Sequence, residues 1–209
     1  LFEMGIHGLT MGNHTWDKKD IFDWIDTEKR MVRPANFPAK APGRGWTKIK
    51  ANGKSLIMVN LQGRTFLPPL DCPFQKIDDI LDEVDDESCV LVDFHAEATS
   101  EKISMGWYLD GRIAALVGTH THVQTHDDRI LPAKTAYITD VGMVGAMNGV
   151  LGMEKESVLY KFKTQLPARF EAAKGTWHFH GVLLSLNEQT KLAESIDLIR
   201  LDEEKLIFF

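Results

Sequence analysis

The chain has little cysteine, no long apolar run and no surplus of positive charge, and each absence excludes a class of protein. Its two cysteines, Cys72 and Cys89, stand in no CxxC or zinc-ribbon spacing, so neither a disulfide framework nor a cysteine-ligated metal is encoded. Sparse cysteine favours a reducing, cytoplasmic compartment. No apolar run approaches the roughly 18 residues that span a bilayer, so we expect no membrane partner.

The charge balance is 24 basic against 30 acidic residues, a formal net charge of −6. Binding to nucleic acid without regard to sequence needs clustered positive charge, so such binding is disfavoured. We expect nucleic acid only as the source of an RNA-derived substrate or as a regulatory partner. The composition, 44% hydrophobic and 26% charged, is that of a folded globular protein rather than a disordered chain.

The chain also lacks an initiator methionine and a signal peptide. It opens on Leu-Phe-Glu-Met-Gly, a pattern typical of a helix that ends in a glycine turn. The first ten residues include Glu3 and His7 and have neither the basic region nor the cleavage site of a secretory signal. We expect residues 1–209 to form a single domain that is incomplete at its N-terminus.

Short apolar runs alternate with segments of helical spacing, which predicts a layered α/β fold. Runs such as 89–92 and 114–117 are apolar throughout, as in strands buried on both faces. Apolar residues three or four apart predict helices around 74–84 and 158–166. The predicted strands are 55–60, 88–94, 113–119, 136–139, 181–186 and 193–201.

The N-terminal segment predicts a strand over 5–10, a Gly-Asn-His loop, and a helix that begins at Asp17. Asp17 resembles an N-cap, with Asp20 as its partner at the third helical position. Four apolar residues at helical spacing are expected on one buried face, namely Ile21, Phe22, Trp24 and Ile25.

Polar side chains of the ligand type follow three of the predicted strands. Asn13 offers a neutral oxygen and His95 an imidazole, and His120 and His122 form an HxH pair. Because sites collect at the carboxyl ends of α/β strands, we expect these side chains to meet. Ligands gathered from three strand ends suit a site for two metal ions about 3.5 to 4 Å apart.

The HxH segment carries its own expectations. In an extended backbone, His120 and His122 point to the same face about 6 to 7 Å apart, so both can approach one metal centre. Gly118 is expected to permit a tight exit from the strand. The small Thr119 and Thr121 are expected to leave room for the imidazoles.

Each of these motifs has an ordinary structural explanation when taken alone. A buried histidine is usually a hydrogen-bonded core residue, and an asparagine after glycine is a typical turn residue. Their joint occurrence at the ends of three apolar strands favours a metal site.

The motif order resembles that of the calcineurin-like metallophosphoesterases, in which GNH, a lone histidine and GHTH follow one another. The sequence around these motifs is similar to that of one bacterial branch, the YmdB-like cyclic-nucleotide phosphodiesterases, and the similarity extends over essentially the whole chain. The segments that carry it are TMGNHTWD at 10–17, RPANFP at 33–38, NLQGRTFLPPLDCPF at 60–74, DFHAEATSEK at 93–102, VGTHTHVQT at 117–125 and ITDVGM at 138–143.

This resemblance implies a fold and a set of roles. The fold would be the four-layer αββα metallophosphoesterase sandwich, lacking its first βα units in this chain. Asn13, His95 and His120 would hold one metal ion, and His122 would hold the other. His14 would be the proton donor, since imidazole titrates near pH 6.5; the alternative for His14 is a hydrogen bond at a helix start.

The implied activity is metal-dependent hydrolysis of a small-molecule phosphodiester. The favoured substrate is a 2',3'-cyclic nucleotide or a related phosphate ester, attacked by a water that two metal ions activate. Iron or manganese is favoured and zinc also suits the ligands. A homo-oligomer is expected. The alternative function is a regulatory scaffold that keeps the phosphoesterase fold and binds RNA or a protein.

The chain departs from the family pattern in its carboxylates. The aspartate after the family's first strand and the Glu-Asn pair after its second have no counterpart here, because only Glu3 precedes Gly12 as an acid. Four neutral ligands leave the repulsion between two cations uncompensated, so we expect little or no activity from these 209 residues. Asp93 and Glu97 are nearby acids that the family does not use as ligands.

Other residues have weaker signals. Arg64 follows a strand and could contact a phosphate through two parallel hydrogen bonds, although a surface role is the alternative. His178 and His180 alternate with aromatic residues, which is typical of a half-buried strand and favours a structural role. The apolar ending 206–209 is interpreted as a docked tail or an oligomer contact.

Overall fold

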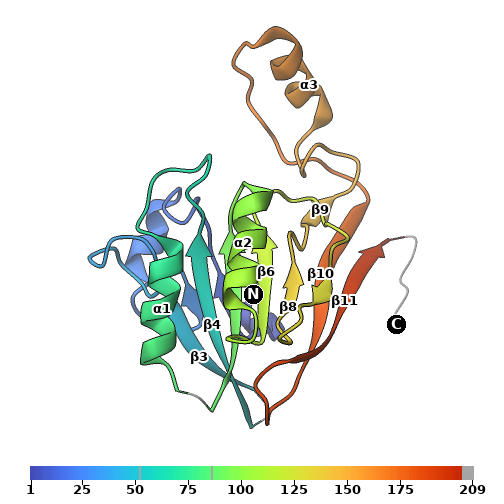
Figure 1. The fold of residues 1–209 in the computed structure, drawn as a ribbon. Coiled ribbons are helices and arrows are strands. Elements are labelled where there is room, and N and C mark those ends of the chain that lie inside the picture. The colour runs from blue at the N-terminus through green and yellow to red at the C-terminus, as the bar shows by residue number, and fades with distance from the viewer. Residues whose placement is uncertain (52, 86, 204–209) are drawn as a thin grey trace.

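The computed structural model describes residues 1–51, 53–85 and 87–203, and its centre is a six-stranded sheet (Figure 1). The strands run in the order β3-β4-β5-β6-β8-β7. The four inner strands are parallel, and β3 and β7 pair antiparallel at the two edges. Their bounds are β3 Trp46–Ala51, β4 Lys54–Gln62, β5 Cys89–His95, β6 Ala115–Thr119, β7 Arg129–Ile130 and β8 Ala136–Ile138. The carboxyl ends of four strands therefore meet at one edge.

Two helices cover one face of this sheet, α1 over Pro73–Glu83 and α2 over Thr99–Leu109 (Figure 1). Ile77 of α1 and Met105 of α2 are fully buried against the apolar strands β4 and β5. Parallel strands covered on both faces read as continuous apolar runs, as predicted for 89–92. The helix predicted around 74–84 is confirmed as α1.

A second sheet covers the other face. It contains β9 (Val144–Ala146), β10 (Trp177–Leu186) and β11 (Ala193–Asp202), in the order β11-β10-β9. Ala193 and Ile196 of β11 pack against Ala136 and Ile138 of the central sheet. The predicted strands near 181–186 and 193–201 are confirmed, and so is the mixed α/β class.

The described residues supply three layers: helices, the large sheet and the small sheet. The resemblance implied a fourth, helical layer on the small sheet, and the part of the chain that the structure describes places no α-helix there. Leu183 on β10 is accordingly 58% exposed. Three of the four expected layers are therefore present in the described residues, and the helical layer on the small sheet is not.

The third helix, α3 (Lys155–Thr164), stands away from the body on an arm between β9 and β10 (Figure 1). The predicted helix is confirmed, but its apolar face is not packed. Val158 is buried, whereas Leu159, Phe162 and Leu166 are 54%, 73% and 52% exposed. Periodicity located the helix without identifying what its apolar side chains contact.

The N-terminal predictions need correction. The strand over 5–10 is shorter, because β1 spans Leu9–Thr10 and pairs parallel with β2 (Met31–Val32), after a short 3-10 helix η1 (Phe2–Met4). The helix predicted from Asp17 is wrong: the segment forms only the 3-10 helix η2 (Lys19–Asp23).

The predicted capping and burial of that segment are wrong too. The residue before η2 makes no side-chain cap, and the Asp17 carboxylate instead accepts a hydrogen bond from His14. A 3-10 helix has three residues per turn, so the expected α-helical face does not form. Ile21 and Ile25 are buried, but Phe22 and Trp24 are 48% and 39% exposed.

No helix within the described ranges is long and apolar enough to cross a bilayer. The longest, α1 and α2, have 11 residues each. The apolar ending 206–209, interpreted above as a docked tail or an oligomer contact, lies outside the described residues.

Candidate metal centre

The candidate site lies at the carboxyl edge of the central sheet. His95 is the last residue of β5 and pairs in register with Thr119, the last residue of β6. His120 follows directly, and the loop after β1 brings in Asn13. Three segments far apart in the sequence thus end side by side, as predicted from the apolar runs that precede them.

Three of the predicted ligands converge. The Oδ1 atom of Asn13 lies 2.8 Å from His95 Nε2, and His120 Nδ1 lies 3.1 Å from the same nitrogen. Two ligand atoms that bind one ion at about 2.1 Å and at right angles lie about 3 Å apart. The donor atoms of Asn13, His95 and His120 therefore fit part of the coordination shell of one metal ion.

The donor set is neutral and incomplete. Among residues 1–51, 53–85 and 87–203, no group of three or more His, Cys, Asp or Glu side chains is arranged to hold a metal ion. The convergent set depends on an amide oxygen and two imidazoles. A carboxylate does contact it: Glu97 Oε2 lies 3.0 Å from His120 Nε2. This acid was not among the predicted ligands.

Gly12 is required by the position of the His95 ring. A Cβ atom at residue 12 would overlap the His95 imidazole, so only glycine lets the ring lie against this backbone. The glycine of the GNH motif thus has a packing role that supports the histidine from a different strand.

A second hydrogen bond orients His95. Its Nδ1 lies 3.0 Å from the Thr119 hydroxyl, which donates at 2.8 Å to Oδ1 of the buried Asp93. Because the hydroxyl hydrogen is directed at the carboxylate, its oxygen accepts from Nδ1–H and Nε2 keeps its lone pair for a metal. The sequence analysis treated Thr119 only as a small residue; its cross-strand register with His95 is the missed signal.

The environment sets the protonation of this relay. Burial, followed by the charge of His120, lowers the pKa of His95 to about 3, which keeps the ring in the neutral form that binds metals. Burial also raises the pKa of Asp93 to about 6, against hydrogen bonds from Thr10 and Thr119. Burial lowers the pKa of His120, with Glu97 acting in the opposite direction.

The HxH segment is not extended, so the geometry predicted for it is wrong. The strand β6 ends at Thr119, and His120 and His122 have positive φ angles of 98° and 67°. Such left-handed backbone is unusual for residues with a side chain and is incompatible with the extended geometry predicted for the pair. His122 is exposed and makes no hydrogen bond with the other three ligands in the described part of the chain.

A buried ion pair fixes this left-handed segment. The carboxylate of Asp140 accepts hydrogen bonds from Lys102 Nζ at 2.9 Å and from the backbone N and hydroxyl of Thr121 at 3.0 and 2.7 Å. Lys102 and Asp140 are fully buried. Thr121, expected only to leave room for imidazoles, is therefore a tether between the two histidines.

Gly118 is needed for close packing rather than for a strand exit. A Cβ atom there would overlap the carbonyl oxygen of Thr139, just beyond β8. The glycine of the GTHTH motif thus lets the chain segments that carry His120 and Asp140 approach each other.

Of the remaining predicted site residues, His14 borders the convergent set and Arg64 makes no contact with it in the described part of the chain. His14 is exposed, with its Nε2 3.4 Å from the Asn13 amide and its Nδ1 2.8 Å from Asp17 Oδ2. The Arg64 guanidinium donates to Cys72 Sγ at 3.4 Å. The functional roles given to His14, His122 and Arg64 stay predictions.

Comparison with known proteins agrees with the motif resemblance. A family model described as YmdB-like protein matches residues 1–199. The chain is 55% identical over 209 residues to the 2',3'-cyclic-nucleotide 2'-phosphodiesterase of Bacillus subtilis (strain 168), over 100% of this chain and 79% of that protein.

Solved structures show the same fold. A hypothetical protein from Thermus thermophilus superposes with a TM-score of 0.91 at 41% identity, over 97% of this chain and 79% of that one. A novel phosphatase from Mycoplasma pneumoniae superposes with a TM-score of 0.88 at 34% identity, over 96% of this chain and 74% of that one. The predicted resemblance is confirmed: the chain belongs to the YmdB-like protein family.

Proposed function

We propose that the protein is a metal-dependent phosphodiesterase that hydrolyses a 2',3'-cyclic nucleotide. The convergence of Asn13 Oδ1, His95 Nε2 and His120 Nδ1 within 2.8 to 3.1 Å carries this proposal. The 55% identity to the Bacillus subtilis 2',3'-cyclic-nucleotide 2'-phosphodiesterase supports the substrate class.

The residues present divide the work as follows. Bound metal ions supply activation of a water molecule and neutralisation of phosphate charge, and iron or manganese suits this donor set, with zinc as an alternative. Asn13, His95 and His120 hold one ion, and His122 is the ligand available to a second. Asp93 and Thr119 hold the His95 ring so that Nε2 faces Asn13 Oδ1 and His120 Nδ1, the other two atoms that would hold the ion.

His14 is the candidate proton donor. It projects next to Asn13, and Asp17 accepts a hydrogen bond from its Nδ1. In the protonated ring, Nδ1–H stays hydrogen-bonded to Asp17, and Nε2–H gives its proton to the alkoxide that departs when the P–O bond breaks. The exposed ring is open to exchange that proton with solvent afterwards.

The test is hydrolysis of 2',3'-cyclic AMP and 2',3'-cyclic GMP with Mn²⁺ by the 209-residue chain and by the product of the complete gene. In the product of the complete gene, we expect His14→Ala to lower kcat by about 100-fold or more. Mn²⁺ binding should be unchanged. His126→Ala is the matched control, because His126 is an exposed loop residue whose side chain is 85% accessible.

Equal rates for His14→Ala and His126→Ala would remove His14 from the mechanism. Salt-dependent RNA binding without any metal-dependent hydrolysis would favour the alternative function, a regulatory scaffold. Homo-oligomer formation and cytoplasmic location stay predictions.

A further inference from the structure

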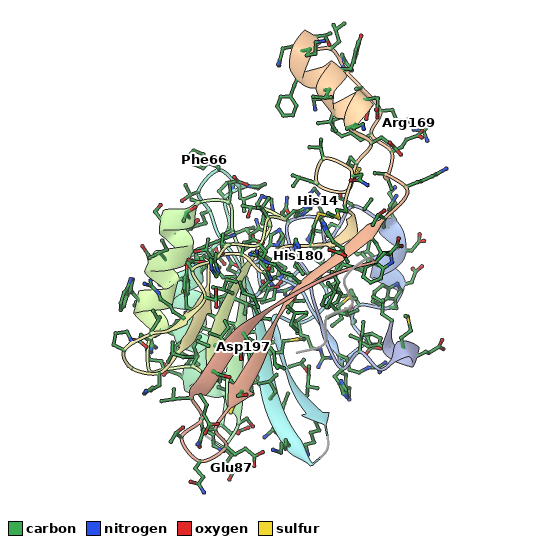
Figure 2. All side chains as sticks on the ribbon, turned by 90° about the vertical axis from the view of Figure 1, so that its right-hand side faces the viewer. His14, Phe66, Glu87, Arg169, His180 and Asp197 are labelled. Carbon is green, nitrogen blue, oxygen red and sulfur yellow. The ribbon has the colours of Figure 1, made fainter. Side chains whose placement is uncertain are left out.

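A cavity of about 350 Å³ opens beside the candidate metal centre. His122 forms part of its wall, so the cavity and the HxH segment are continuous. Figure 2 shows His180, another wall residue, toward the same end of the molecule as His14, below the α3 arm. The volume is within the range of about 300 to 1,000 Å³ that is usual for small-molecule sites.

One side of the cavity is apolar and flexible in shape. Met143, Met147 and Leu151 come from the segment that leads into the arm. Thioether side chains adapt to flat aromatic surfaces. The lining therefore suits a planar group.

The other side carries polar atoms that lack partners. His178 and His180 stack with ring centroids 4.4 Å apart, and His178 Nε2 and His180 Nδ1 are buried without a hydrogen bond. Buried polar atoms are normally paired, so these two nitrogens leave this wall of the cavity polar and incompletely hydrogen-bonded. Burial lowers the pKa of His180, so that ring presents a neutral nitrogen that can accept a hydrogen bond.

Arg200 of β11 adds a positioned donor. Its Nε donates to Gln124 Oε1 at 2.6 Å, and Gln124 is itself fixed by a 2.9 Å bond from its Nε2 to the Gly181 carbonyl. The structure gives the terminal amino groups of Arg200 no hydrogen-bond partner within residues 1–51, 53–85 and 87–203. The guanidinium thus keeps its two terminal amino groups available at the cavity wall.

We propose that this cavity binds the guanine base of the nucleotide whose phosphate lies at the metal centre. A guanidinium matches the O6 and N7 acceptors of guanine, whereas adenine presents an amino donor in place of O6. His180, the cross-strand partner of Arg200, lies on the same wall and keeps a neutral ring beside the guanidinium. The proposal rests on the proposed function, because it assigns the base of that substrate.

The test measures binding rather than turnover. The metal-free 209-residue chain is titrated calorimetrically with guanosine 3'-monophosphate and with adenosine 3'-monophosphate. We expect tighter binding of the guanine nucleotide. Arg200→Gln should weaken guanine binding by about tenfold, as expected for loss of a bidentate contact, and should change adenine binding much less.

Two further variants and a control keep the result interpretable. Arg200→Lys keeps the positive charge but loses the pair of parallel N–H donors of the guanidinium, so it should also weaken guanine binding. Met147→Trp fills the cavity from a half-exposed position and should abolish binding of both nucleotides even if the Arg200 variants do not fold. Arg169→Gln is the control, since Arg169 lies on the arm outside the cavity with a side chain that is 90% exposed (Figure 2).

Equal affinity for the two nucleotides, equal effects of Arg200→Gln and Arg169→Gln, or no binding at millimolar nucleotide would overturn the proposal. Metal-dependent hydrolysis plays no part in this readout. If the phosphodiesterase proposal alone is wrong, the protein will bind the guanine nucleotide but will not hydrolyse the cyclic nucleotide.

Discussion

At the scale of single residues, the imidazole of His95 depends on neighbours that the motif does not contain. Gly12 leaves space for the ring, and Thr119 links it to Asp93 through hydrogen bonds of 3.0 and 2.8 Å. The sequence predicted the histidine from its place after an apolar run. It could not predict the supporting hydroxyl, because that role arises only from the pairing of β5 with β6.

Thr119→Val removes the hydroxyl that links His95 to Asp93 and so tests whether that link supports metal binding. Valine keeps the shape but cannot accept from His95 or donate to Asp93, so we expect Mn²⁺ affinity to fall by about 10- to 100-fold. Mn²⁺ titration followed by electron paramagnetic resonance measures this change. Thr164→Val, at the end of α3, should bind as the unmodified chain does, and equal affinities for the two variants would exclude the relay.

The low pKa of His95 also predicts a pH dependence of stability. The unfolded chain takes up a proton below its ordinary value of 6.5, whereas the folded chain does so only near 3, so the His95 contribution is lost as pH falls from 6.5 toward 3. Asp93 acts in the opposite direction, because its folded-state pKa of about 6 exceeds the ordinary 3.8.

Comparison with His95→Gln separates the two groups, because Asp93 is present in both proteins. The melting temperature of the unmodified chain, relative to that of the variant, should decline as the pH is lowered from 7 to 5. Thermal unfolding followed by circular dichroism measures it in metal-free buffer. A difference that stays constant over this range would show that His95 titrates normally.

At the scale of elements, α2 fixes the loop that carries the HxH pair. Its buried face includes Lys102, Met105, Gly106 and Leu109. Because Lys102 and Gly106 occupy that face, the sequence lacks a regular apolar repeat at helical spacing. This helix was therefore not predicted, although α1 was. The reverse error occurred at 17–25, where apolar spacing was present but the chain formed only a short 3-10 helix.

Lys102→Met should destabilise the fold strongly, because it leaves the carboxylate of Asp140 buried without its cation. Loss of one partner of a buried ion pair costs about 3 to 5 kcal/mol. Urea unfolding measures the change, and Lys102→Met with Asp140→Asn should recover part of it.

Lys76→Met is the matched control for this experiment. Lys76 pairs with Asp79 on the surface of α1, where the aspartate side chain is 68% exposed. Exposed pairs contribute about 0 to 1 kcal/mol, so this variant should be close to neutral. Equal destabilisation by Lys76→Met and Lys102→Met would contradict the role given to the buried pair.

At the scale of the whole molecule, three sheets bring together residues that lie far apart in the sequence. The place of each motif after an apolar strand predicted the convergence of Asn13, His95 and His120. His95 and His120 follow neighbouring parallel strands, β5 and β6, whereas Asn13 follows β1 of the separate β1-β2 sheet. The cavity next to them could not be predicted, since β10, β11 and the segment leading to α3 meet there only after the second sheet packs on the first (Figure 1). In the sequence, His178 and His180 have the alternation of an ordinary half-buried strand. Only the packing of the two sheets places them in the cavity wall.

The most direct test is Mn²⁺ binding by the 209-residue chain, measured by equilibrium titration of the unmodified protein and of His95→Ala, His120→Ala and His126→Ala. We expect Mn²⁺ binding to be lost in His95→Ala and His120→Ala and retained in His126→Ala, because only the first two remove convergent donors. Mn²⁺ bound with unchanged affinity by His95→Ala would contradict the metal centre proposed at the carboxyl edge of the sheet.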